Sequence, residues 1–429
     1  MATLWKKNRL LIALSFILCF VTFIVAKPFN AISIDEVYPY WYMKVALWNN
    51  DGFLRVLRVC IEWGLFLFLI ALVAIAKRRG VKHFLQAGSY LLYSSLIIRV
   101  AIIWLLKIEN AYFIDLFTTN KSAWITVSIF GNNVPLIWLL LDICTLLIIM
   151  GAFIISVGIL HTLIVSYADS LGGSMGLSLA AVVIAIGLKV FLDESYSHSQ
   201  IGELSILYSM LGVLSLICVI YVVLNQRGLN NYTISKREKQ SSPSILLSAK
   251  SVISIFTFLL TIPLGYSFIL YCIFVSRSTY QGDLYGPSLL LAGLLFTFAL
   301  PIIGFLIDKQ KQTPSKRVFI ASYIGVISVA LSCISEQLLV APILVGVIPM
   351  AYILCSLLSI LAHNNYRNET PAFIVLVIYL TIVLSHVLWI NLNSLALAFG
   401  NQRIVFLLIS MLITILTYLL KLSDRYSHQ

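Results

Sequence analysis

The sequence predicts an all-α, polytopic membrane protein with twelve transmembrane helices. Three observations predict it: the composition is very apolar, apolar runs of spanning length recur along the chain, and basic residues favour one side of the predicted topology. Of 429 residues, 60% are hydrophobic and 11% are charged, whereas a water-soluble domain carries about 25% charged residues. The bilayer is therefore the expected solvent.

Twelve segments are apolar and long enough to cross a hydrocarbon core, which takes about 20 residues of α-helix. The first follows Lys6, Lys7 and Arg9, as a signal peptide would, but Ala26-Lys27-Pro28 is a poor cleavage site, so we expect a retained helix. In chain order the expected spans are residues 9–26, 57–76, 84–106, 136–160, 174–192, 204–225, 251–276, 287–307, 318–335, 339–362, 372–393 and 403–420.

The basic residues indicate the orientation. With both termini in the cytoplasm, 19 of the 29 Lys and Arg fall inside and 8 outside, and the other two, Arg99 and Lys189, lie within spans. This is the bias expected of a membrane protein. It accounts for the net charge of +12, so we expect no nucleic-acid partner. A bacterial inner membrane is the default location, and we expect a monomer.

A polar, Ser-rich and charged stretch divides the spans six and six. It predicts an N-terminal six-helix bundle over residues 1–225, a cytoplasmic linker over 226–250 and a C-terminal six-helix bundle over 251–429. Two outer segments, 28–55 and 108–135, are longer than connections need and rich in aromatic residues. We interpret them as interfacial helices rather than as gating lids, although the sequence leaves their role open.

The cysteines and the loops indicate no cofactor. All seven cysteines lie in or beside spans without a Cys-x-x-Cys pair, which favours packing over a metal site or disulfides. No Gly-x-x-x-x-Gly-Lys-(Ser/Thr) loop is present, so ATP hydrolysis by that route is not expected.

The strongest motif follows the eighth span and runs from Gly304 through Asp308 and Lys309 to Arg317. It resembles the Gly-x-x-x-Asp-(Arg/Lys) signature of the major facilitator superfamily. The resemblance implies a transporter rather than an enzyme, with two six-helix bundles. It also implies a conformational latch at Gly304, Asp308 and Lys309: the glycine permits close helix approach, and the carboxylate binds the N-terminus of a neighbouring helix.

The resemblance is incomplete elsewhere. The corresponding loop of the first half, residues 76–82, keeps the basic charge but lacks both the Gly and the Asp. The fourth span has no Arg where many proton-coupled members carry one, and the fifth has no Gly-Pro-x-x-Gly-Gly antiporter signature. These departures argue against a drug exporter.

Four ionisable residues lie within spans, where charge is costly and usually functional: Glu62, Arg99, Asp142 and Lys189. Each lies roughly 6–9 Å outward of its span centre at a rise of 1.5 Å per residue. Two acids and two bases at one level can form a structural ion-pair network or snorkel, or they can serve transport. By the resemblance, Asp142 is the best candidate for the cavity, Lys189 and Glu62 lie at its edge, and Arg99 braces Glu62 or a neighbouring helix. A carboxylate near a cation can take and release a proton as the cavity opens to either side, so Asp142 is the expected proton carrier.

The second half contributes neutral polar groups. Candidates for the cavity are Tyr266, Tyr271 and Tyr352. His386 is a candidate proton relay, although a lone histidine in a membrane helix is more often a packed, hydrogen-bonded residue. Pro263 and Pro349 are places where a membrane helix can break and release carbonyls.

These observations predict a proton-coupled secondary transporter of a small polar or zwitterionic solute, such as an amino acid or related metabolite. One alternative is an exporter of an amphipathic compound, a drug or siderophore, with the same fold. A membrane-embedded transferase using Asp35 and Glu36, and a flippase or assembly component, are further alternatives.

Overall fold

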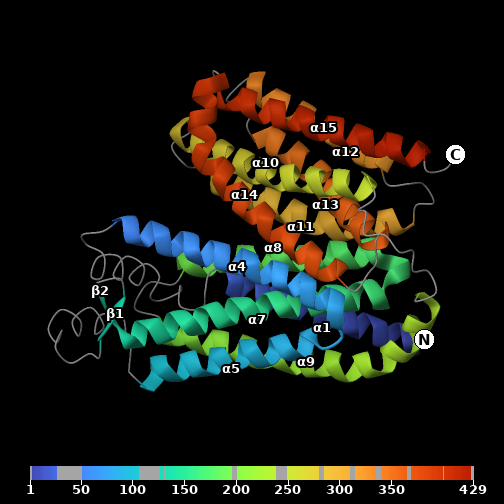
Figure 1. The fold of residues 1–429 in the computed structure, drawn as a ribbon. Helices are drawn as coiled ribbons and strands as arrows, with labels where there is room; N and C mark the ends of the chain where they lie inside the picture. Colours follow the sequence, from blue (N-terminus) through green and yellow to red (C-terminus); the bar gives the residue numbers. More distant parts are fainter. Residues whose placement is uncertain are drawn as a thin grey trace. The chain divides into compact units, whose positions relative to one another are not determined.

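The computed structural model describes residues 2–26, 51–105, 126–129, 132–195, 201–237, 249–279, 285–309, 315–334, 340–364, 369–399 and 401–426. These residues form twelve α-helices, a short 3-10 helix and a two-stranded hairpin (Figure 1). The α-helices are α1 (Ala2–Ala26), α4 (Asp51–Arg79), α5 (Phe84–Leu105), α7 (Leu136–Ser166), α8 (Leu171–Ser195), α9 (Ile201–Arg237), α10 (Ala249–Thr279), α11 (Tyr285–Asp308), α12 (Ser315–Ile334), α13 (Val340–Asn364), α14 (Thr370–Phe399) and α15 (Gln402–Tyr426). The 3-10 helix is η1 (Ala168–Ser170).

Each expected span coincides with one of these helices to within a residue or is contained in it. Six described segments are long and apolar enough to cross a membrane: Asn8–Val25, Phe84–Ile102, Ile143–Ser166, Ala168–Leu188, Ser209–Gln226 and Gln402–Ser423. Helix α9 continues to Arg237, through the first part of the expected linker 226–250, and residues 238–248 lie outside the described part.

The second outer segment differs from the expectation. Residues 126–135 contain an antiparallel hairpin, β1 (Thr126–Ile129) and β2 (Asn132–Pro135), in which Thr126 lies opposite Pro135. This part of 108–135 is therefore not an interfacial helix. Segment 28–50 and residues 106–125 lie outside the described residues.

Many of the buried hydroxyls donate to a carbonyl of their own helix. Thr381 donates to the Val377 carbonyl at 2.7 Å, and Ser178 donates to the Ser174 carbonyl at 2.8 Å. A polar side chain without water must find a partner in the protein, and a carbonyl one turn back is always within reach. Such residues are therefore compatible with membrane helices.

By contacts the chain forms two compact units. Unit 1 comprises Met1–His161 and Ile184–Asn231, and unit 2 comprises Thr162–Val183 and Tyr232–Gln429. The end of α7, η1 and the start of α8 thus belong to unit 2 although they lie in the first half of the sequence. The division into bundles at 1–225 and 251–429 remains a proposal.

In unit 1, α5 packs closely on α7 through glycines. A Cβ on Gly151 would lie 2.7 Å from the Leu92 nitrogen, and one on Gly158 would lie 2.7 Å from the Leu85 nitrogen. Helix α5 also meets α9, because the Tyr93 and Ser215 hydroxyls lie 2.5 Å apart.

In unit 2, α12 packs on α13 and α15, α10 on α13, α14 and α15, and α11 on α13 (Figure 1). Leu264, Phe268, Val405 and Phe406 belong to one of its apolar cores. Helices α10 and α13 continue through Pro263 and Pro349, so neither proline breaks its helix.

Candidate functional site: a carboxylate clasp on a helix N-terminus

A polar contact between two helices of unit 2 begins at the last residue of α11. Asp308 ends this helix, and the Lys309 N–H still donates to the Phe305 carbonyl at 3.2 Å. An anion at a helix C-terminus is unfavourable, because the last carbonyls carry partial negative charge. Asp308 therefore needs a positive partner from outside its own helix.

The start of α8 supplies that partner. The Gly172 N–H donates to Asp308 Oδ1 at 2.7 Å, and the Gly173 N–H donates to Asp308 Oδ2 at 2.6 Å. Both amides lie in the first turn of α8, where N–H groups lack a carbonyl within the helix and the dipole favours an anion. We call this arrangement the Asp308 clasp.

The clasp requires the two backbones to touch. A Cβ on Gly172 would lie 2.6 Å from the Gly304 carbonyl oxygen, and a Cβ on Gly304 would clash with the Gly172 carbonyl and lie 3.1 Å from the Gly173 Cα. One turn on, a Cβ on Gly176 would overlap the Leu300 carbonyl. Only glycine permits this approach, as in other tight membrane-helix contacts.

A hydrophobic core continues the contact along α8, α11 and α13. It comprises Ala180, Leu300, Ile303, Ala351 and Cys355, with Tyr352 packed against it. The Cys355 thiol donates to the Leu300 carbonyl at 3.6 Å. The clasp therefore stands at one end of a continuous helix interface rather than on an isolated loop.

The third residue of the motif does not take part in the clasp. Lys309 is exposed, and its Nζ lies 4.4 Å from the centre of the Phe305 ring, as in a cation–π contact. In unit 2 the clasp thus rests on Gly304 and Asp308 of the predicted latch.

Among the ionisable residues expected within spans, the structure describes the side chain of Arg99. It is fully buried on α5, and its guanidinium Nη1 donates to the Thr145 hydroxyl on α7. Asp142 lies three residues before Thr145 in α7. The side chains of Glu62 in α4, Asp142, Lys189 in α8 and His386 in α14 lie outside the described part.

The structure does not bring the three candidate tyrosines together. Tyr271 is buried in the core, 5.4 Å from the Phe406 ring, and its hydroxyl accepts a bond from Arg403 Nε at 2.8 Å. Tyr266, on the same helix, is 44% exposed. Tyr352 lies in the separate core beside α11.

Two elements of the clasp are absent from the sequence prediction, the donors Gly172 and Gly173 and the contact at Gly176, and so is the bond from Arg403 to Tyr271 in the separate core. The Gly172-Gly173-x-x-Gly176 spacing at the start of the fifth span is the signal for the first two. Within the described residues no group of His, Cys, Asp and Glu could hold a metal ion.

No family model matches the sequence, and no curated protein matches it either. Solved structures do match over nearly the whole chain. A bacterial homologue of the iron transporter ferroportin, in the outward-facing state, has a TM-score of 0.64 and 10% identity, with 97% of this chain and 99% of that chain covered.

Two other structures are described as major facilitator superfamily proteins. The transporter FucP, in the outward conformation, has a TM-score of 0.61 and 15% identity, with coverage of 95% of this chain and 97% of the other. The proton:xylose symporter XylE has a TM-score of 0.60 and 12% identity, with coverage of 96% and 95%. The all-α, twelve-helix fold expected from the sequence is confirmed.

Proposed function

Because the chain has the major facilitator fold, we propose that it is a secondary transporter that moves a small solute by alternating access. The observation that carries the proposal is the Asp308 clasp. Alternating access needs a contact at one face that holds one state and can be released. Two charge-assisted bonds between a helix end and a helix start have this property.

We propose that the clasp is the inner latch of the transporter. In the orientation inferred from the basic residues, the end of α11 and the start of α8 lie at the cytoplasmic face. Two of the compared structures are outward-facing or in an outward conformation, a state in which the inner face is closed. The clasp then belongs to the outward-facing state and opens on the way to the inward-facing one.

The moving parts in this proposal are the bundles 1–225 and 251–429, joined by the linker 226–250. The start of α8 is a first-half segment by sequence, yet it is tied to α11 within unit 2. Such a tie is what a latch between two halves of a chain requires. We propose that the protein works as a monomer in a bacterial inner membrane, with both termini in the cytoplasm.

For the solute we propose a small polar or zwitterionic molecule, such as an amino acid, carried with protons. The support is the set of ionisable residues in the first half. Arg99 is held against α7 near Asp142 by its bond to Thr145, and residues three apart on a helix share a face. A nearby cation makes the protonation of a carboxylate depend on its surroundings, so Asp142 is the proposed proton carrier.

In this proposal Glu62, Lys189 and His386 are secondary positions at the cavity edge, and Tyr266 supplies a polar ring. Tyr271 has a structural part instead, because its hydroxyl is already engaged by Arg403. XylE is described as a proton symporter, which agrees with coupling to protons but does not define the solute.

The test is transport by the purified protein in proteoliposomes. Counterflow of a labelled amino-acid mixture should occur without a gradient, and an imposed proton gradient should drive accumulation. Asp142→Asn should abolish accumulation but keep counterflow, whereas Asp169→Asn, at an exposed carboxylate of η1, should keep both. Accumulation that survives Asp142→Asn would remove Asp142 as the carrier, and absence of any counterflow would reject this solute class.

A further inference from the structure

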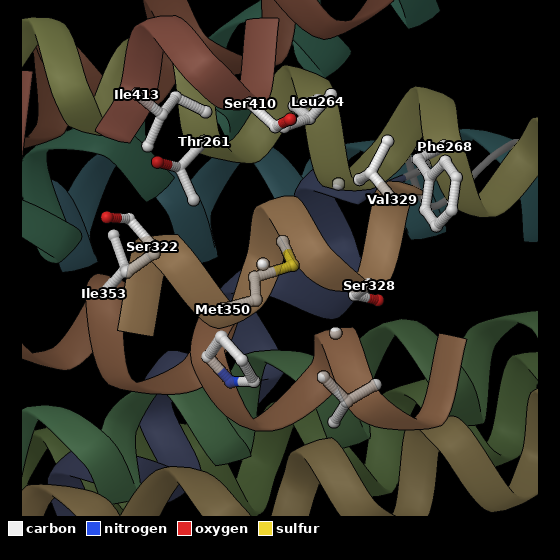
Figure 2. A pocket seen from close by; sticks show the side chains of 15 residues that line it. Thr261, Leu264, Phe268, Ser322, Ser328, Val329, Met350, Ile353, Ser410 and Ile413 are labelled. Atoms are coloured by element: carbon white, nitrogen blue, oxygen red, sulfur yellow. The ribbon is translucent and has the colours of Figure 1, made fainter. Parts of the chain in front are cut away.

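A partly open cavity of about 90 Å³ lies between helices of unit 2, away from the Asp308 clasp. It is lined by residues of α10, α12, α13 and α15, and Figure 2 shows Met350 in the middle of this lining. The lining includes Thr261, Leu264 and Gly265 of α10, Ser322, Gly325 and Ser328 of α12, Gly346, Pro349 and Ile353 of α13, and Ser410 of α15.

The cavity lies at mid-length of all four helices. Its lining includes Leu264, the central residue of α10, Gly325 at the centre of α12 and Ile353 beside the centre of α13. A helix that crosses the bilayer has its middle at the centre of the hydrocarbon core. A molecule that reaches the cavity through the lipid must therefore be soluble in hydrocarbon.

The walls favour an uncharged guest. Among the described residues that line the cavity none is charged, and the four hydroxyl residues are buried. Their hydroxyls already bond within the protein: Thr261 donates to the Thr257 carbonyl at 2.7 Å, Ser410 donates to the Leu407 carbonyl at 2.8 Å, and Ser322 lies 2.7 Å from the Thr417 hydroxyl. Because the cavity provides few free hydrogen-bonding groups, it binds water weakly.

Glycines keep the space open. A Cβ on Gly325 would meet no atom within 4 Å, so a larger residue there would extend into empty space. A Cβ on Gly346 would lie 3.0 Å from the Ser328 hydroxyl, and one on Gly265 would lie 2.6 Å from the Met350 sulfur. Met350 is a flexible side chain and forms the adjustable part of the wall beside Pro349.

We propose that this cavity is a binding site for a small, uncharged, hydrocarbon-soluble molecule that differs from the polar solute of the proposed function. Cavities lined by Leu, Ile and Phe with a volume of about 150 Å³ bind xenon or benzene. The smaller cavity here accepts a guest of xenon size, and movement of Met350 enlarges it. A guest would lie between α10 and α13, beside the one position in α13 where Pro349 removes a backbone hydrogen bond.

The test uses the full-length protein in lipid nanodiscs and xenon as the probe. Xenon-129 exchange NMR should show a protein-bound resonance distinct from xenon in water and lipid. Gly325→Leu fills the cavity and should remove that resonance. Gly293→Leu is the matched control, because Gly293 also has open space at its Cβ but does not line the cavity; it should retain the resonance.

Met350→Ala gives an independent measurement, since it enlarges the site without filling it. It should shift the bound resonance and increase the rise in thermal unfolding midpoint that benzene produces. Absence of a bound resonance in the unaltered protein would overturn the proposal. So would a resonance that persists in Gly325→Leu, or one that disappears equally in Gly293→Leu.

Discussion

Removing the charge of Asp308 should expose the start of α8 to solvent exchange. In Asp308→Asn one carbonyl oxygen remains to accept from a glycine amide, while the side-chain NH2 faces the other N–H. The variant loses one charge-assisted bond, of about 1.5–3 kcal/mol, and the attraction of an anion to the helix N-terminus, about 0.3–1 kcal/mol. We take about 2 kcal/mol as the net loss after partial exposure and compensation by water.

That loss predicts the size of the effect. Since 1.4 kcal/mol corresponds to a factor of ten, the opening equilibrium of the clasp should rise about 30-fold. The Gly172 and Gly173 amides, which donate to Asp308, should exchange faster by the same factor. Hydrogen–deuterium exchange mass spectrometry of the peptide covering residues 168–176, in nanodiscs at fixed pH, measures this directly.

Asp169→Asn is the control for that experiment. Asp169 lies in η1, also near the N-terminus of α8, but is exposed. It should change the exchange of the same peptide by much less than tenfold, because a screened surface charge contributes little. Equal exchange in Asp308→Asn and the unaltered protein would refute the view that the clasp protects these amides.

Three further predictions concern packing and are measured by the apparent thermal unfolding midpoint in detergent. Gly304→Ala should destabilise the protein by about 1–3 kcal/mol, because the added Cβ has no room against α8. Gly293→Ala is the control, and it should be neutral or stabilising because the space beside Gly293 is open. Equal effects of the two substitutions would argue against the close contact of α11 with α8. Tyr271→Phe should lower the stability by about 1 kcal/mol, because it removes the hydroxyl that accepts a hydrogen bond from the Arg403 guanidinium. Tyr266→Phe, which changes an exposed ring, should lower the stability by less than about 0.5 kcal/mol. A reversed order would contradict the assignment of Tyr271 to the core. Thr145→Val should cost about 1.5–3 kcal/mol by removing a hydrogen bond to a buried cation, and an unchanged midpoint would show that this bond is dispensable.

The helices could be predicted from the sequence because the membrane makes hydropathy a local property. A run of about 20 apolar residues has few alternatives to helix in a bilayer, so the position of α13, for example, needs no knowledge of its neighbours. The hairpin was missed for the opposite reason. The alternation in Thr126–Ile129 and the following Gly131 are hairpin signals, but the aromatic composition of the segment favoured an interfacial helix.

Half of the candidate site could be predicted, because one side of the clasp has a motif and the other has none. Gly304 and Asp308 stand in a recognisable pattern, whereas Gly172 and Gly173 act through backbone N–H groups that every residue possesses. Their role depends on which helix start faces the end of α11, which is a property of the tertiary structure. Likewise, the sequence identifies Arg99 as a charged residue within a span. Its partner Thr145 could not be predicted, because it is one of many hydroxyl residues in spans.

The two corresponding loops show why the carboxylate is informative. At the end of α4, Gly80 adopts a φ of 73° and its N–H donates to the Ala76 carbonyl at 2.9 Å, while Lys77, Arg78 and Arg79 occupy the last turn. A left-handed glycine and cations near the last carbonyls complete a helix C-terminus by themselves. That end therefore needs no partner helix.

The end of α11 is built the other way. Its last residue is a carboxylate and its last turn contains no basic residue, so its terminus is locally unfavourable by the same electrostatics. The Gly172 and Gly173 N–H groups compensate the unfavourable placement while the start of α8 is adjacent. The stability of a helix end that needs no partner does not change when another helix moves away. The stability of a helix end that needs a partner does change, and a latch must have this dependence.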